Sequence, residues 1–264
     1  MSKRHDKIGI KQGLRKEWLD FALNLRLAGV TDKEMRYELT EYMGSRLDNG
    51  ELGTRGEFTT KIAVCMLMKV WGKCDNELEV LQRNALALAK NDNFLACHWA
   101  MLCAAYPFWH KVAQQTGRLL FLQVQTNKAQ IIQRIRENYG DRSSVIRSAQ
   151  RVIQGFMGCG TIITTDNYQL ELTNTTLLST DLTILLYEAA LYADKEGKAA
   201  LGLLKNNPAF FPFQLPVLSG DYIAQQSNTI DVVRYGLDDE LLKLKDNLTN
   251  GGKYDFGVCQ TIIT

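Results

Sequence analysis

Residues 126–173 read TNKAQIIQRIRENYGDRSSVIRSAQRVIQGFMGCGTIITTDNYQLELT, and this stretch carries the clearest structural signal in the chain. Its first part predicts a helix. Thr126 is a suitable N-cap, because its hydroxyl can accept a hydrogen bond from an early backbone N–H. Apolar side chains then recur at helical spacing as far as Tyr139, and Gly140 stands where a helix usually ends.

A second helix is predicted after a short turn, with Ser143 or Ser144 as its N-cap and an end at Gly158 or Gly160. Its apolar positions share one face, made of Val145, Ala149, Val152 and Phe156. Its polar face carries Ser143, Arg147, Gln150, Arg151 and Gln154. This division is typical of a helix that packs one side on a core.

Two β-like runs follow, at 161–165 and 168–173. Asp166 and Asn167 lie between them and tolerate the backbone of a tight hairpin turn. In the second run Tyr168, Leu170 and Leu172 alternate with polar residues, as expected for a half-buried strand. The order helix, turn, helix, hairpin predicts a winged helix-turn-helix.

The second helix of a helix-turn-helix enters the major groove of DNA, and its N-terminal residues contact base edges. Arginine can pair with guanine and glutamine with adenine, and both can hold phosphates. We therefore predict an interface with double-stranded DNA that uses Ser143, Ser144, Arg147, Gln150 and Arg151. Phosphate contacts are predicted from Lys128, Arg134, Arg136 and Arg142.

The distribution of charge supports a polyanionic partner for this stretch. Residues 126–160 contain six basic and two acidic side chains. The whole chain has 31 basic and 29 acidic residues, so the remainder carries 25 and 27. A net charge of +2 says little, but its concentration on one motif favours binding to nucleic acid.

A protein-binding role is the alternative interpretation. Winged helices also serve as interaction modules, and arginine is a common residue on solvated helix faces. The predicted hairpin carries Asp166 and Glu171, which would repel phosphate. In this reading the chain is a scaffold that docks a larger protein partner without touching DNA.

The rest of the chain predicts a mainly α fold built from a helical bundle. Few prolines interrupt it, and the run from Phe94 to Tyr106 is apolar nearly all round, so it should lie at the centre of the core and end at Pro107. After the wing we expect a proline-rich strap at 206–216, a strand at 229–235 and a short helix at 237–245. The predicted organisation is a flexible basic arm at 1–12, a helical bundle at 13–123, a winged segment at 124–178 and a C-terminal region at 179–264.

Composition predicts a cytoplasmic protein that is not an enzyme. The basic start lacks the apolar segment of a signal peptide, and the apolar run 62–71 is too short to cross a bilayer. The six cysteines, without a secretory context, are expected to be reduced thiols. No nucleophile, metal-ligand or nucleotide-binding motif occurs, so we expect neither a cofactor nor a metal.

Four runs resemble the BrxA family, a small accessory component of bacterial BREX phage-exclusion systems. They are CAAYPFW at 103–109, GRLL at 117–120, YGDRSS at 139–144 and RVIQGFMGCG at 151–160. The similarity extends over roughly residues 20–205. It implies an all-helical protein whose winged segment binds double-stranded DNA. It also implies work beside other phage-defence proteins, without enzymatic activity of its own.

Overall fold

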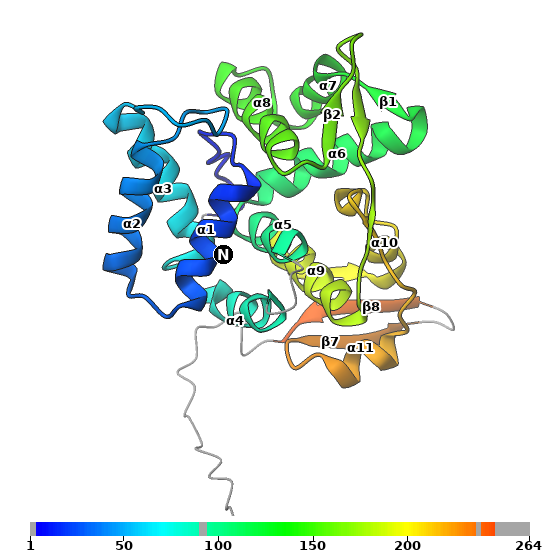
Figure 1. Ribbon diagram of the computed structural model, residues 1–264. Helices are drawn as coiled ribbons and strands as arrows, with labels where there is room; N and C mark the ends of the chain where they lie inside the picture. Colours follow the sequence, from blue (N-terminus) through cyan, green and yellow to red (C-terminus); the bar gives the residue numbers. More distant parts are fainter. Residues whose placement is uncertain (1–3, 90–93, 236–238, 246–264) are drawn as a thin grey trace, which may run out of the picture.

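Helices dominate the computed structural model, which describes residues 4–89, 94–235 and 239–245 (Figure 1). The N-terminal half is helical apart from its connections, an isolated bridge and one very short strand. Its helices are α1 (Lys16–Leu27), α2 (Asp32–Gly44), α3 (Glu57–Trp71), the 3-10 turn η1 (Asn76–Leu78), α4 (Glu79–Leu88), α5 (Phe94–Ala105) and α6 (Pro107–Gln123). The mainly α class predicted from the sequence is confirmed. No helix within the described residues is long and apolar enough to span a membrane.

Helix α5 runs through the core, as the sequence predicted. Every one of its residues from Ala96 to Ala105 is buried. It packs along α9 (Thr180–Ala193), whose side chains are buried from Leu182 onward. Pro107 occupies the first turn of α6, where its missing N–H costs no helical hydrogen bond, so α5 and α6 meet at this residue.

An aromatic cluster joins α5 to distant parts of the chain. The Trp99 ring stacks on Phe156 at 5.3 Å and meets the edge of Phe211 at 5.4 Å, measured between ring centroids. Its indole N–H donates to the carbonyl oxygen of Ala209 at 2.9 Å. The proline-rich strap therefore packs on the body, and both Phe210 and Ala209 are buried.

The central stretch forms α7 (Lys128–Tyr139) and α8 (Ser143–Gly158), followed by β2 (Ile162–Thr164) and β3 (Leu170–Leu172). Strand β3 lies antiparallel between β2 and a short strand that precedes α7, β1 (Gln125–Thr126). The sequence missed β1, because two residues are too few to show alternation. These elements lie together at the top of Figure 1, from its centre to its right side.

Local details of this stretch differ from the predictions. The N-cap of α7 is Asn127 rather than Thr126, and that of α8 is Arg142, whose side chain makes no capping bond. Tyr168 does not join the inner face of β3. It lies in the preceding turn with a φ of +57° and is 84% exposed.

A capping box fixes the start of α7. The Asn127 side chain accepts from the Gln130 backbone N–H at 2.9 Å, and the Gln130 side chain accepts from the Asn127 N–H at 3.1 Å. We expect Asn127→Ala to lower the free energy of unfolding by about 1 kcal/mol, because it leaves a helix-start donor without its acceptor. Urea unfolding measures this. Gln133→Ala, an exposed change within α7, should have almost no effect, and equal losses in both variants would contradict the capping role.

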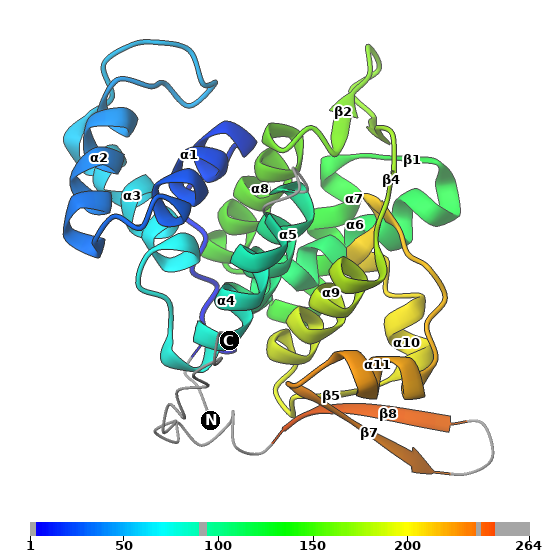
Figure 2. The same ribbon diagram turned by 60° about the horizontal axis from the view of Figure 1, so that its bottom comes forward.

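The C-terminal region contains more β structure than predicted. Its helical elements are α9, α10 (Leu201–Lys205), η3 (Pro208–Phe210) and α11 (Gly220–Gln226). A parallel pair joins β4 (Thr176–Leu177) to β6 (Phe213–Gln214). A three-stranded sheet orders β5 (Lys198–Ala200), β8 (Asp239–Leu244) and β7 (Ile230–Tyr235) and lies at the lower end of the molecule (Figure 2).

The predicted strand at 229–235 is confirmed as β7, but the predicted helix at 237–245 is wrong. Residues 239–244 form the central strand of the sheet, between β5 and β7. Buried Leu242 and Leu244 alternate with more exposed neighbours along it. The expected loose end at 250–252 lies outside the described residues.

Residues 4–12 are not the flexible arm that the sequence predicted. Arg4 is only 4% exposed, donates to the Tyr192 carbonyl oxygen at 2.9 Å and lies 3.3 Å from a Glu77 carboxylate oxygen. Ile10 is buried, and its carbonyl oxygen accepts a hydrogen bond from Ser148. This segment is held to the body at both ends.

Candidate nucleic-acid interface

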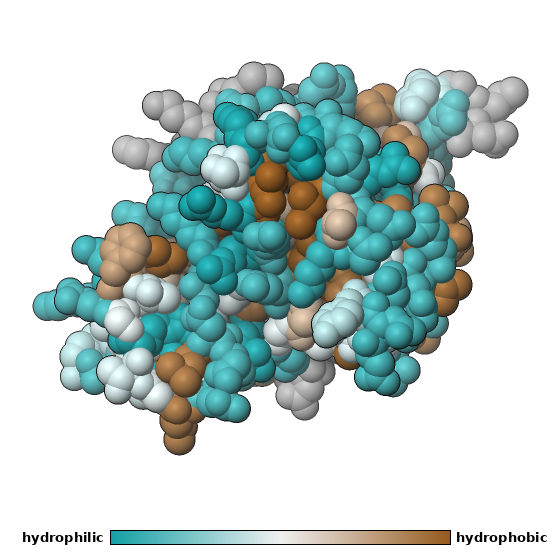
Figure 3. All heavy atoms as spheres, turned by 90° about the horizontal axis from the view of Figure 1, so that it is seen from above, coloured by the Kyte–Doolittle hydropathy of each residue, from teal (hydrophilic) through white to brown (hydrophobic). Residues whose placement is uncertain are grey.

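Helix α8 presents a polar face opposite a completely buried apolar one. Its core positions, among them Val145, Ala149 and Phe156, have no exposed surface. Arg147 and Gln150 lie on the opposite side and are exposed, and neither has a hydrogen bond or ion pair within the described part of the chain. Hydrophilic residues cover most of the molecular face on which α7, α8 and β2 lie (Figure 3).

The N-terminus of α8 adds backbone donors to this face. Ser143 and Ser144 are exposed and occupy the first turn of α8, after the N-cap position, so neither is the N-cap that the sequence predicted. Because the side chain at the N-cap position, Arg142, accepts no bond, the first-turn N–H groups are not satisfied by a cap. Such a helix start attracts anions, and its positive dipole end lies beside the Arg142 and Arg147 side chains.

The second half of α8 is covered by the N-terminal segment. Gly158 allows this approach, since a Cβ there would lie 2.7 Å from the Leu14 carbonyl oxygen, whereas a Cβ on Gly155 would meet the Trp109 ring of α6 at 2.6 Å. A Cβ on Gly13 would lie 2.9 Å from that of Gln154. Arg151 stands beside this contact, is half-buried and donates to the Gln154 side chain at 3.0 Å. The free polar face of α8 is therefore its N-terminal half.

The four predicted phosphate contacts do not form one surface. Arg134 and Arg136 are two positions apart on α7, which places them about 200° apart around the helix axis. Arg134 pairs with Glu137 at 3.8 Å, and Arg136 pairs with Asp141 in the turn before α8. Arg142 lies in the same turn, so Arg136 and Arg142 are the two that lie near the start of α8.

Lys128 lies in the first turn of α7, at the other end of the helix. A helix of this length separates it from Arg142 by roughly 20 Å. Lys128 is exposed and has no ion pair among the described residues. It can meet the same duplex as α8 only if the duplex also passes the start of α7.

The two acidic residues of the predicted hairpin lie in different surroundings. Asp166 is exposed in the turn, but the Glu171 carboxylate accepts a hydrogen bond from the Gln125 side chain on β1. Thr165 and Tyr168 close the turn through a backbone hydrogen bond of 2.9 Å. The exposed ring of Tyr168 thus projects from the turn between the strands.

Two buried histidines, His98 and His110, lie inside the fold. His98 is completely buried and accepts from the Trp71 indole N–H at 3.0 Å, while its other nitrogen lies 2.9 Å from an Asp20 oxygen. Burial lowers the pKa of His98 despite Asp20, and it lowers the pKa of His110 to about 3. Both imidazoles are therefore neutral near pH 7.

Two further features concern metal and thiol chemistry. Within the described residues, no three or more His, Cys, Asp or Glu side chains gather as a metal site would require. The described cysteines are free thiols, and of these Cys65 is exposed.

Sequence reasoning missed the contact between the N-terminal segment and α8. Gly158 was the available signal, because a glycine on a helix permits close approach of another backbone segment. No protein-family model, curated protein or solved structure matches this chain.

Proposed function

We propose that the region from α6 to β3 is a winged helix-turn-helix that binds double-stranded DNA. The observation that carries the proposal is the exposed N-terminal half of α8, where Arg147 and Gln150 have no protein partner among the described residues. The order of α6, β1, α7, α8, β2 and β3 agrees with that of a winged helix, and helix α8 would be the one that enters the major groove.

In this proposal the start of α8 reads the duplex and its flanks hold the backbone. Arg147 and Gln150 contact base edges, and Ser143 and Ser144 offer hydroxyl and backbone donors to a phosphate. Arg136 and Arg142 add charge from the turn before α8. Arg151 contributes through its charge at the border of the N-terminal segment, and Lys128 and Arg134 serve as outer phosphate contacts.

The wider role follows from the resemblance to the BrxA family. We propose a non-enzymatic accessory protein of a bacterial phage-defence system, which acts in the cytoplasm beside other defence proteins. The absence of a recognisable catalytic motif in the sequence agrees with this role, and so does the structural use of His98 and His110.

The test is binding to a short labelled duplex at about 50 and 200 mM salt, followed by fluorescence anisotropy. Affinity should fall steeply with salt, because bound phosphates release counterions. Arg147→Ala/Gln150→Ala should weaken binding at least about tenfold, corresponding to about 1.4 kcal/mol. If Arg147 holds a phosphate, Arg147→Ala should reduce the slope of log affinity against log salt concentration by about 1. If Arg147 contacts a base, the same change should relax the sequence preference.

A double change on a remote helix provides the matched control. Lys33→Ala/Arg36→Ala alters two exposed residues of α2 and should leave affinity unchanged. Equal weakening in both variants would mean that binding depends on overall charge only. Absence of binding at the lower salt would remove the DNA proposal.

The scaffold alternative has one observation in its favour. Phe121, Leu122 and Val124 lie at the end of α6 with exposed fractions of 90%, 77% and 76%. Contiguous exposed apolar side chains are typical of protein interfaces. The strap at 208–216 gives this alternative less support, because Phe210 and Phe213 are buried. Two results together would favour the scaffold. The wild-type chain would not bind duplex DNA, and Phe121→Ser/Leu122→Ser would abolish its binding to a protein partner.

A further inference from the structure

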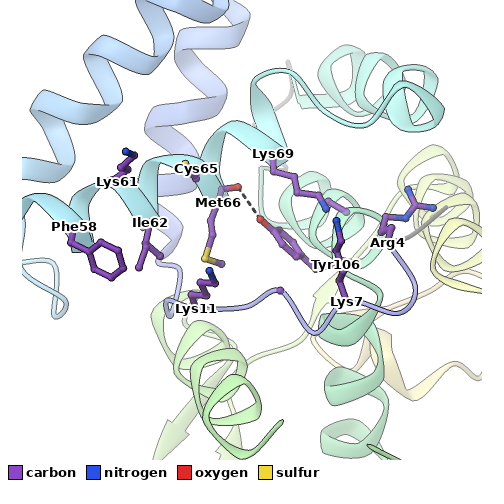
Figure 4. Close-up of a pocket in the computed structure, with 12 residues that line it drawn as sticks. Arg4, Lys7, Lys11, Phe58, Lys61, Ile62, Cys65, Met66, Lys69 and Tyr106 are labelled. Atoms are coloured by element: carbon purple, nitrogen blue, oxygen red, sulfur yellow. Dashed lines mark hydrogen bonds between the residues drawn. The ribbon is translucent and has the colours of Figure 1, made fainter. Parts of the chain in front are cut away.

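A second feature with binding chemistry lies away from α7 and α8, between the N-terminal segment and α3. There residues 4–11 cross beside α3 and the junction of α5 with α6, and they enclose a cavity of about 410 Å³ (Figure 4). This volume lies in the range of sites for small organic ligands. The cavity is open to solvent on one side.

The walls combine apolar and basic side chains. Phe58, Ile62, Met66 and Tyr106 supply apolar surface, and Phe58 is 77% exposed at the rim. No acidic side chain of the described residues lines the cavity. The basic residues that line it are Arg4, Lys7, Lys11, Lys61 and Lys69.

Two of these cations are committed to the fold. Arg4 is held by Glu77 and by the Tyr192 carbonyl oxygen. Lys69 lies 3.5 Å from an Asp75 carboxylate oxygen, and its ammonium group is 5.0 Å from the centre of the Tyr106 ring. These contacts order the wall and offset part of its charge.

The other three lysines have no such partner. Lys7, Lys11 and Lys61 are exposed and form no ion pair with any acid that the structure describes. Lys7 and Lys11 extend from the N-terminal segment toward the wall, whereas the Lys61 side chain points away from both of them (Figure 4). Repulsion between Lys7 and Lys11 is relieved when an anion binds between them, and the apolar wall favours a ligand that also has an apolar body.

We propose that this cavity binds a small organic anion, with its acidic group between Lys7 and Lys11 and its apolar body against Phe58, Ile62 and Met66. Phosphate and carboxylate head groups share the required chemistry. The site is independent of the proposed DNA interface, because α8 contributes no residue to its lining.

The first experiment titrates the whole chain with anilinonaphthalene sulfonate, a fluorescent anion with an aromatic body. Lys7→Gln/Lys11→Gln should weaken its binding at least about tenfold, and Phe58→Ala should weaken it as well. Lys33→Gln/Lys73→Gln, which removes two exposed lysines outside the cavity, should leave binding unchanged. Arg147→Ala/Gln150→Ala should also leave it unchanged, which separates this site from the DNA interface.

Competition identifies the head group. Displacement of the probe by adenosine monophosphate assigns a phosphate on an aromatic body, and displacement by decanoate assigns a carboxylate on an aliphatic one. Displacement by neither would overturn the proposal. Equal affinity of the two lysine double variants would also overturn it, because the probe would then bind apolar surface elsewhere.

Cys65 provides a second readout inside the cavity. It lines the wall on the same stripe of α3 as Lys61 and Lys69, at intervals of four residues. In a Cys259→Ser background, bound probe should slow the alkylation of Cys65 by iodoacetamide, measured by mass spectrometry. An unchanged alkylation rate at saturating probe would place the ligand outside the cavity.

Discussion

Replacing Glu188 by glutamine is expected to stabilise the protein at about pH 8 by about 3 kcal/mol more than at about pH 4.5. Glu188 lies on α9 and is only 2% exposed. Burial raises the pKa of its carboxyl group from 4.5 to about 7, against the opposing effect of hydrogen bonds from Thr229 and Asn84. Ionisation of the Glu188 carboxyl group therefore destabilises the folded state.

The sign of this pH dependence follows from the order in which the unfolded and folded states lose the Glu188 proton. Below pH 4.5 both folded and unfolded chains hold it, so the group adds no pH-dependent cost. Between pH 4.5 and about 7 the unfolded chain releases its proton first, and stability falls as pH rises. Above about pH 7 both states are ionised and the full cost remains.

Urea unfolding of wild type and Glu188→Gln at several pH values measures this effect. Asp181→Asn changes an exposed acid on the same helix. Its free energy of unfolding should differ from that of wild type by an amount that stays nearly constant with pH. If the free energies of unfolding of Glu188→Gln and wild type also differ by an amount independent of pH, burial does not raise the pKa of this carboxyl group in the folded protein.

Gly117→Ala is expected to lower the free energy of unfolding by about 3 kcal/mol, at the upper end of overpacking costs. Gly117 lies where α6 crosses η3. A Cβ there would collide with the Pro208 carbonyl oxygen, 2.8 Å from its carbonyl carbon, and would lie 3.1 Å from the Phe211 Cβ. The obstacle is backbone, so no side-chain rotation relieves it. The strap and the aromatic cluster around Trp99 must shift together.

Gly202→Ala is the matched control, because Gly202 is a helical glycine in α10 with no atom within 4 Å of the added Cβ. It should leave stability unchanged or raise it by up to about 1 kcal/mol. Thermal and urea unfolding compare the two variants. Similar behaviour of both would mean that α6 and η3 are not in close contact in solution.

The predictions that held depend on patterns within single elements. The apolar run around Trp99 is buried as α5 because a helix without a polar side can only lie inside the protein. The polar face of α8 was also correctly placed, since Val145, Ala149 and Phe156 recur at helical spacing and direct Arg147 and Gln150 outward.

The predictions that failed concern segments whose local pattern fits more than one structure. Residues 239–244 contain leucines at spacings that suit a helix or a strand, and pairing with β7 and β5 selects the strand. Arg4 and Ile10 lie in a short polar segment that resembles a free tail. They are ordered by partners far along the chain, such as Tyr192 and Ser148.

The candidate interface combines both kinds of information. Residue types and helical period place Arg147, Gln150 and the two serines on one exposed helix face, because side-chain direction repeats every 3.6 residues whatever the surroundings. The usable length of that face is set by residues 10–15, which cover its second half through the close approaches of Leu14 to Gly158 and of Gly13 to Gln154. Glu188 is likewise an ordinary helical glutamate in the sequence, and only burial among α9's neighbours raises its pKa. Such long-range contacts depend on which distant surfaces fit together, and a local pattern carries no information about that fit.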